Sequence, residues 1–211
     1  MLQKHASLSP ESRVLEIGCG CGRTAIALAD IVDDGNYLGM DIERVALEAS
    51  KSNPLLRRKN FAFELLDVQN DLYNPAGRYP ATQYVFPLPD GRFDVVFMTS
   101  VVTHMLTDEV RNYAREIARI LRPGGRCYLT AFLLDKDMER PFPFRAQEHS
   151  YMDEACPEVA VAYRAQFLSS TFAENGMELS VGPLWGTVHG GVAETGDYQD
   201  VVVFSKKGHQ A

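Results

Sequence analysis

Short runs of apolar residues alternate along this chain with longer segments in which apolar residues recur every three or four positions. The short runs predict buried strands, and the longer segments predict amphipathic helices. The continuous run Phe93–Met98 is typical of a parallel-sheet strand that is buried on both faces. One helix is expected to begin with Thr107 as its cap and to end at the turn Pro123-Gly124-Gly125. The pattern therefore predicts an alternation of strands and helices.

The predicted elements define a fold class. We expect strands at residues 13–17, 36–41, 61–66, 93–98, 126–133, 177–181 and 198–205. Further helices are expected at residues 23–31, at residues 43–52, and over the segment that carries Ala160, Tyr163, Phe167, Leu168 and Phe172. Such an alternation predicts an α/β protein with a doubly wound, mostly parallel seven-stranded sheet and helices on both faces. Because no helix separates the last two strands, the seventh strand should run antiparallel.

Two long segments, at residues 70–90 and 134–158, interrupt this alternation. Both exceed the length of ordinary loops, which favours a functional cover over a site. Apart from them the chain has no repeat, low-complexity tract or linker. We therefore predict one domain over residues 1–211.

Composition and charge narrow the classes of function. The 211 residues are 45% hydrophobic and 23% charged, with a net charge of −7. That acidic balance argues against a phosphate-tracking surface, so we expect no nucleic-acid substrate. No apolar stretch approaches the roughly 20 residues of a membrane span, and the polar start of the chain is unlike a signal peptide. We therefore expect a cytoplasmic protein that does not enter membranes.

The four cysteines do not point to a disulfide framework or to a metal site. Their spacing matches neither a disulfide framework nor a zinc ribbon. Cys19 and Cys21 form a C-x-C pair inside a glycine turn, where we expect small packed residues rather than metal ligands. This usage fits a reducing compartment.

The first predicted strand runs into three glycines at alternate positions, Gly18, Gly20 and Gly22, and then into a helix. Glycine lets the backbone turn sharply and lets a ligand lie directly on it. The helix that follows directs free N–H groups toward the turn. A dinucleotide fingerprint would need Gly or Ala at position 23, which is Arg23 here, and no Gly-Lys-Ser/Thr follows as in a P-loop. The spacing therefore indicates a nucleotide-cofactor site of another kind.

The pattern Glu16-x-Gly18-x-Gly20-x-Gly22 resembles the first motif of the class I S-adenosylmethionine (SAM) dependent methyltransferases. Phe93-Asp94-Val95-Val96 resembles the fourth-strand motif of that family, and Leu121-Arg122-Pro123-Gly124-Gly125 resembles its turn before the fifth strand. The resemblance covers nearly the whole chain. It implies a Rossmann-like fold with a reversed seventh strand, and it implies SAM as the cofactor.

Several residues are candidates for contact with this cofactor. Asp41 ends the second strand, where a carboxylate accepts hydrogen bonds from ribose hydroxyls, although it could instead cap the next helix. The resemblance implies that Glu16 helps to hold the loop and the ammonium end of the cofactor, and that Asp67 lies near the adenine amino group. The alternative for Glu16 is a solvated carboxylate. The remaining predicted contacts are Cys19, Gly20, Gly22, Arg23, Ile42, Val68 and Thr99.

His104 is the candidate catalytic residue. It follows the fourth strand after a short connection, at the sheet edge where ligands of such folds lie. An imidazole can take up a proton near pH 7, which a methyl acceptor requires only if it holds its own proton tightly. The alternative is a hydrogen-bonded histidine that orients the loop before the Thr107 helix.

The candidate acceptor contacts come from two regions. Tyr73 and Tyr79 lie in the 70–90 segment and could line the binding site of an aromatic acceptor. They could instead belong to a small hydrophobic cluster beneath a long loop. Trp185, His189 and Asp200 lie on the connection between the last two strands and reach the same edge by topology. The carboxylate of Asp200 could orient an acceptor or pin the hairpin.

These observations predict transfer of a methyl group from SAM to an oxygen or nitrogen atom of a small organic molecule. The alternatives are a SAM-binding regulatory protein without transfer and a protein methyltransferase. About a dozen residues precede the first strand, whereas many family members carry an N-terminal helix that closes over the cofactor. Either the two long segments form the lid, or the chain is a fragment or a member with an open site.

Overall fold

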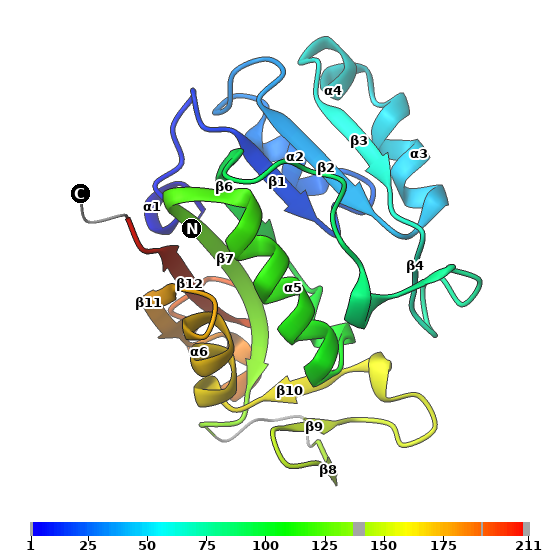
Figure 1. Cartoon of the computed structure of the whole chain (residues 1–211), viewed down its shortest axis with the longest axis vertical. Helices are drawn as coiled ribbons and strands as arrows, with labels where there is room; N and C mark the ends of the chain where they lie inside the picture. The colour runs from blue at the N-terminus through cyan, green and yellow to red at the C-terminus, as the bar shows by residue number, and fades with distance from the viewer. Residues whose placement is uncertain (1, 137–141, 191, 209–211) are drawn as a thin grey trace.

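The computed structural model describes residues 2–136, 142–190 and 192–208. Its central sheet has the order β3-β2-β1-β6-β7-β12-β11 (Figure 1). These strands are β1 (Val14–Ile17), β2 (Tyr37–Asp41), β3 (Ala62–Leu65), β6 (Phe93–Met98), β7 (Leu121–Leu133), β11 (Met177–Leu184) and β12 (Asp200–Lys206). Neighbours from β3 to β7 pair in parallel, and β12 pairs antiparallel with both β7 and β11. The predicted fold class and the reversed last strand are confirmed.

Helices cover both faces of this sheet. The helices are α1 (Leu2–His5), α2 (Arg23–Leu28), α3 (Arg44–Ser52), α4 (Pro54–Arg58), α5 (Thr107–Ile120) and α6 (Ala165–Ala173). Side chains alternate along β6, so that Val96 and Met98 join the core under α5 and α6, while Val95 and Phe97 join the core under α2 and α4. Within the described ranges, none of these helices is long and apolar enough to cross a membrane.

The register of the parallel strands brings their carboxyl ends to one edge. Ile17 at the end of β1 pairs with Met40 of β2 on one side and with Met98 of β6 on the other. The residues that come directly after Ile17, Met40 and Met98 are therefore neighbours, although they are far apart in the sequence. They are Gly18, Asp41 and Thr99.

The second long segment is more regular than its composition indicated. Its described part forms β8 (Phe144–Arg145) and β9 (His149–Tyr151) and ends in the short 3-10 helix η3 (Pro157–Val159), which β10 (Val161–Tyr163) follows. Strand β10 pairs with β7 beyond the end of β6, with Ala162 beside Phe132, and lengthens the sheet (Figure 1). Residues 137–141 lie outside the described part of the chain.

This arrangement corrects one predicted helix. Helix α6 begins at Ala165, so Ala160 precedes strand β10 and Tyr163 belongs to it. The hydroxyl of Tyr163 donates hydrogen bonds to the backbone oxygens of Val102 and Met105. Pairing with β7 and these buried contacts outweigh the helical spacing of the apolar residues, as tertiary context often does.

The first long segment is attached to α5. It contains β5 (Tyr79–Pro80), which pairs with β4 (Val68–Gln69), and the 3-10 helix η1 (Ala81–Gln83). The side-chain amide of Asn112 donates to the backbone oxygens of Ala81 and Tyr84 at 2.7 and 2.9 Å. The carboxylate of Glu116 accepts from the N–H of Phe86. These bonds hold the segment against the helix that faces the strand edge.

Candidate functional site

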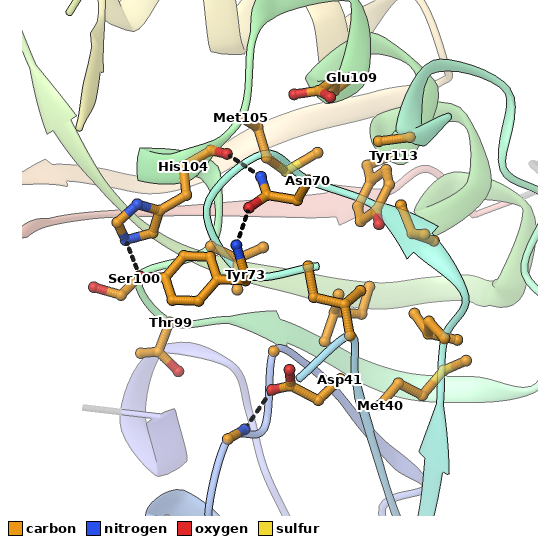
Figure 2. Close-up of a pocket in the computed structure, with 18 of the residues that line it drawn as sticks. Met40, Asp41, Asn70, Tyr73, Thr99, Ser100, His104, Met105, Glu109 and Tyr113 are labelled. Carbon is orange, nitrogen blue, oxygen red and sulfur yellow. Dashed lines mark hydrogen bonds between the residues drawn. The ribbon is translucent and has the colours of Figure 1, made fainter. Parts of the chain in front are cut away.

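A cavity of about 320 Å³, here called the main cavity, lies at the carboxyl edge of the parallel strands. Its wall comes from the glycine turn, the ends of β2 and β6, the segment 66–81, the 3-10 helix η2 (Val102–His104) and the start of α5. Figure 2 shows Met40 and Asp41 at one end, His104, Met105 and Glu109 at the other, and Tyr73 between them. The predicted site residues in this wall are Gly18, Gly20, Arg23, Asp41, Ile42, Val68, Tyr73, Thr99 and His104.

The glycine turn needs its glycines for two different reasons. Gly18 has φ +77°, and a Cβ atom there would lie 2.3 Å from the Cγ2 atom of Val101. Gly20 has φ +51°, but a Cβ atom there would meet nothing within 4 Å. Both lie in the left-handed region that favours glycine. Gly20 lines the main cavity, so the absence of a side chain leaves the backbone open to a ligand there.

Asp41 connects the turn to the end of β2. One carboxylate oxygen accepts from the N–H of Gly20 at 2.6 Å, and the other accepts from the N–H of Glu43 at 2.8 Å (Figure 2 shows the first bond). Helix α3 is capped by Glu43, whose carboxylate accepts from the N–H groups of Val45 and Ala46. Asp41 is therefore not the cap of this helix, and its carboxylate faces the cavity.

The end of β6 carries a polar atom without a partner. The buried Thr99 hydroxyl oxygen has no hydrogen-bond partner within the described residues, and Thr99 lines the cavity. The next residue, Ser100, has φ +59°, which is uncommon for a residue with a side chain. Its N–H donates to the Thr130 hydroxyl at 2.8 Å, and its own hydroxyl accepts from the Gln199 amide at 2.5 Å. Such backbone conformations gather at functional sites.

His104 is held by contacts from two remote segments. Its Nδ1 atom lies 2.9 Å from the backbone oxygen of Glu158, and its Nε2 atom lies 3.4 Å from the Tyr73 hydroxyl. A carbonyl oxygen only accepts, so this contact places the proton on Nδ1 and leaves a lone pair on Nε2. Asn70 fixes the same loop, because its amide donates to the His104 backbone oxygen while its side-chain oxygen accepts from the Tyr73 N–H. The arrangement directs the basic nitrogen toward Tyr73.

Glu109 lines the main cavity, and sequence reasoning missed it. Helix α5 begins at Thr107 instead of being capped by it, and the Glu109 carboxylate accepts from the N–H of Leu106 at 2.6 Å. Burial raises the pKa of Glu109 to about 7. Tyr113 lies one turn further on the same helix and also lines the cavity. The signal in the sequence was their spacing of four, which places both side chains on one face of a helix.

Glu16 lies beneath the glycine turn and outside the lining of the main cavity. It is 2% exposed, and its carboxyl group accepts a hydrogen bond from the Tyr37 hydroxyl. Burial raises its pKa to about 7, and the hydrogen bonds from Tyr37 and Thr24 act in the opposite direction. Any effect of Glu16 on a ligand would therefore act through the turn.

Four other predicted residues also lie outside the main cavity lining. Cys19 is buried against Gly39, and Gly22, with φ +80°, is the residue before helix α2. Asp67 pairs with Arg78 at the surface, which lowers its pKa through hydrogen bonds from that side chain and backbone. Tyr79 is 50% exposed. The structure thus brings Tyr73, but not Tyr79, to the cavity.

The connection between β11 and β12 places its candidates elsewhere. The side chains of His189 and Asp200 are fully buried, and their Nε2 and carboxylate atoms lie 2.9 Å apart. Asp200 also accepts from the N–H groups of Leu133 and Gly186. Trp185 contacts the His189 ring edge-on. These contacts favour the alternative in which Asp200 pins the connection.

A family model described as a methyltransferase domain matches residues 15–127, more than half of the chain. The chain belongs to this methyltransferase family. The match begins in β1 and ends in β7, so it includes the glycine turn, Asp41 and His104.

Curated relatives agree with this assignment. The uncharacterized methyltransferase YcgJ of Bacillus subtilis is 30% identical over 137 residues, 65% of this chain and 47% of that protein. The ribosomal protein L11 methyltransferase of Burkholderia mallei is 30% identical over 127 residues, 60% of this chain and 34% of that protein. This methyltransferase domain thus spans about half the length, or less, of these relatives. The names of matched relatives include protein, RNA and O-methyltransferases.

Solved structures show the same fold. A SAM-dependent methyltransferase from Methanosarcina mazei superposes with a TM-score of 0.65 at 20% identity, covering 98% of this chain and 97% of that one. The methyltransferase domain therefore has the Rossmann-like fold of class I SAM-dependent methyltransferases.

Proposed function

We propose that this methyltransferase domain binds SAM in the main cavity and transfers its methyl group to an oxygen or nitrogen atom of a small organic molecule. The observation that carries the proposal is the wall of the main cavity. It joins the open space at Gly20, the Asp41 carboxylate and the unpartnered Thr99 hydroxyl at the carboxyl edge of the strands. Ligands of open α/β sheets bind at this edge.

The residues of the main cavity fit this cofactor. Gly18 and Gly20 would let it lie on the backbone, and Asp41 would accept hydrogen bonds from its ribose hydroxyls. Ile42 and Val68 offer apolar contact to an adenine ring, and Thr99 offers an unpaired hydroxyl. A volume of about 320 Å³ lies at the lower end of the range for ligand pockets. SAM, when bound, supplies a methyl group on a positively charged sulfur.

The chain's own residues would bind and orient the acceptor and accept its proton. Much of the rate of such a transfer comes from alignment of the acceptor atom, which Tyr73 and Asn70 would help to maintain around His104. His104 would take up the acceptor proton at Nε2, since its Nδ1 proton is held by Glu158. Hydrogen bonding of the other ring nitrogen orients a histidine for this role.

The small-molecule acceptor is supported by the net charge of −7, which does not favour nucleic acid. A protein acceptor is the second candidate, because one matched relative is named a ribosomal protein L11 methyltransferase.

The experiment is incubation with SAM that carries a labelled methyl group, together with a metabolite extract and, separately, with extracted protein and RNA. We expect label in low-mass products. Label in protein or RNA instead would replace the small-molecule acceptor with that class. Binding of SAM without transfer to any fraction would contradict catalysis and support a regulatory role.

A further inference from the structure

A second cavity, of about 230 Å³, also has His104 in its lining. We call it the aromatic cavity, and the residues that define it here are Thr103, His104, Phe132, Phe142, Met152 and Val188. They come from η2, β7, the 142–152 segment and the connection between β11 and β12. The proposed function assigns no ligand to this cavity.

The two cavities share a wall. His104 lines both of them. Ser100 lines the main cavity, Gln199 lines the aromatic cavity, and the Gln199 amide donates to the Ser100 hydroxyl at 2.5 Å. The side-chain oxygen of Gln199 accepts from the Thr130 hydroxyl, also at 2.5 Å. A molecule in the aromatic cavity would therefore lie beside the residues that end β6.

The chemistry of the wall selects an apolar ring. Phe132 contacts Phe142 with ring centroids 5.5 Å apart, and it contacts Tyr198 edge-on at 5.8 Å. Aromatic rings favour such offset and edge-on contacts, so this wall suits a further ring. Within the described residues, the lining includes no carboxylate, lysine or arginine side chain. A charged ligand would lose its hydration without a partner of opposite charge.

One polar side chain in the lining of this apolar space has no hydrogen-bond partner within the described residues. Thr103 is fully buried, lines the aromatic cavity, and its hydroxyl oxygen has no hydrogen-bond partner within the described residues. Buried hydroxyls are normally paired, because leaving one unpaired costs stability. A ligand with one hydrogen-bonding substituent would satisfy it.

Size narrows the ligand further. Phe132, Phe142, Ala160, Ala162 and Val188 form a hydrophobic cluster separate from the two main cores. Their side chains do not close over the space between them, although protein interiors are normally packed without such voids. An engineered cavity of roughly 150 Å³ is sufficient for benzene. The aromatic cavity therefore has room for one ring with one or two small substituents.

We propose that the aromatic cavity binds the ring of the methyl acceptor, and that the acceptor is an uncharged molecule with a single aromatic ring and two polar substituents. One is the reacting hydroxyl or amino group, which lies at His104 beside the main cavity, and the other is a hydrogen-bonding group that pairs with Thr103. The identification of the ligand as the methyl acceptor rests on the proposed function. Binding of a ligand in the aromatic cavity can be tested separately. Thr103 is the hydrogen-bonding partner inside the cavity, and His104 is the residue that the ligand shares with the main cavity.

The methionines of this chain make the test direct. Met40 and Met105 line the main cavity, and Met152 lines the aromatic cavity. We would label the methionine methyl groups with carbon-13 and record their signals by NMR. Addition of S-adenosylhomocysteine should move the signals of Met40 and Met105. Addition of 4-methylphenol, an uncharged probe at neutral pH, should move the signal of Met152, whereas 4-methylbenzoate should leave it unchanged.

A pair of matched variants tests the hydroxyl. Thr103→Val should weaken 4-methylphenol binding by about 3- to 10-fold, the value of one hydrogen bond. Thr171→Val removes another buried, unpartnered hydroxyl, on helix α6, and should leave the probe affinity unchanged. Neither change removes a hydrogen bond of the described structure, so both proteins should fold. Ala160→Leu, which fills part of the cavity, should abolish the Met152 response without moving the signals of Met40 and Met105.

The outcomes separate the inference from the proposed function. If 4-methylphenol moves Met105 but not Met152, or if 4-methylbenzoate binds as well, the inference is wrong. Equal probe affinity in Thr103→Val and the unaltered protein would also overturn it. If S-adenosylhomocysteine moves neither Met40 nor Met105, the proposed function fails, whatever Met152 shows.

Discussion

The two ends of the main cavity are built in different ways. At the Asp41 end, the wall contains the glycine turn and comes from the ends of two neighbouring strands, with Gly20 and Asp41 joined by a hydrogen bond. At the His104 end, the wall is mostly side chains from the 70–81 segment, η2 and α5. His104 itself depends on Glu158, which is 54 residues away in the sequence.

This difference indicates which part of the site can vary among proteins that share this fold. The position of the glycine turn and of Asp41 is fixed by the pairing of the strands that they follow or end, so this part of the binding geometry can persist while the loops change. A wall of side chains from several loops changes with each substitution, which suits recognition of different acceptors on one fold. The family match covers residues 15–127 and so includes both ends of the main cavity, whereas Glu158, which contacts His104, lies outside it.

The largest expected effect is at the His104 end. His104→Gln should lower turnover by about 10²- to 10⁴-fold if the imidazole accepts the acceptor proton. The affinity for S-adenosylhomocysteine, measured by calorimetry, should change little, because the ribose and glycine-turn contacts are untouched. An unchanged turnover would mean that the acceptor needs no base, or that Glu109 supplies it.

The matching test at the other end concerns Asp41. Asp41→Ala should weaken SAM binding by about 10- to 100-fold, because charge-assisted hydrogen bonds are lost. It also removes the acceptor of the Gly20 and Glu43 N–H groups, so stability should fall. Glu43→Ala is the control: it removes the cap of α3 and lowers stability, but it should leave the SAM affinity unchanged. Equal SAM affinity in Asp41→Ala and the unaltered protein would contradict the assignment.

The burial of Glu16 beneath the glycine turn can be tested without a ligand, through the pH dependence of the protein's stability. Its pKa is about 7 in the folded protein against 4.5 for an ordinary glutamate, so the folded state binds the extra proton between these values. Stability should therefore fall as pH rises from about 4.5 to 7, by about 3 kcal/mol at most. Denaturant unfolding of Glu16→Gln should lack this part of the pH dependence, whereas Glu48→Gln, at an exposed site on α3, should retain it. Identical pH profiles for Glu16→Gln and the unaltered protein would contradict the buried carboxyl.

The smallest effects compare two tyrosines of the 70–90 segment. Tyr73→Phe removes the hydroxyl near His104 and should lower turnover by about 3- to 10-fold. Tyr79→Phe changes an exposed side chain outside both cavities and should alter turnover by less than about 2-fold. Steady-state kinetics of the two variants would measure the difference. A larger loss for Tyr79→Phe would show that this part of the segment contacts the acceptor.

The glycine turn and the carboxyl ends of the strands could be predicted because their signals are local. Gly18 and Gly20 follow an apolar strand directly, and both have the positive φ that glycine spacing indicates. Asp41 ends the next strand, which must pair with the first. The role of Glu16 was harder to predict, because a strand end can face either side of the turn and this carboxyl group faces Tyr37.

The sequence by itself determined the order of the seven main strands along the chain, the reversed last strand and the edge at which the main cavity lies. Those features follow from residue periodicity and chain connectivity, which are properties of neighbouring residues. Only the tertiary structure decided that Tyr163 belongs to a strand, that Asp200 is buried against His189, and that Glu109 faces the main cavity. Each of these depends on contacts between distant segments, and such contacts override local propensity because they bury apolar surface and pair buried polar groups.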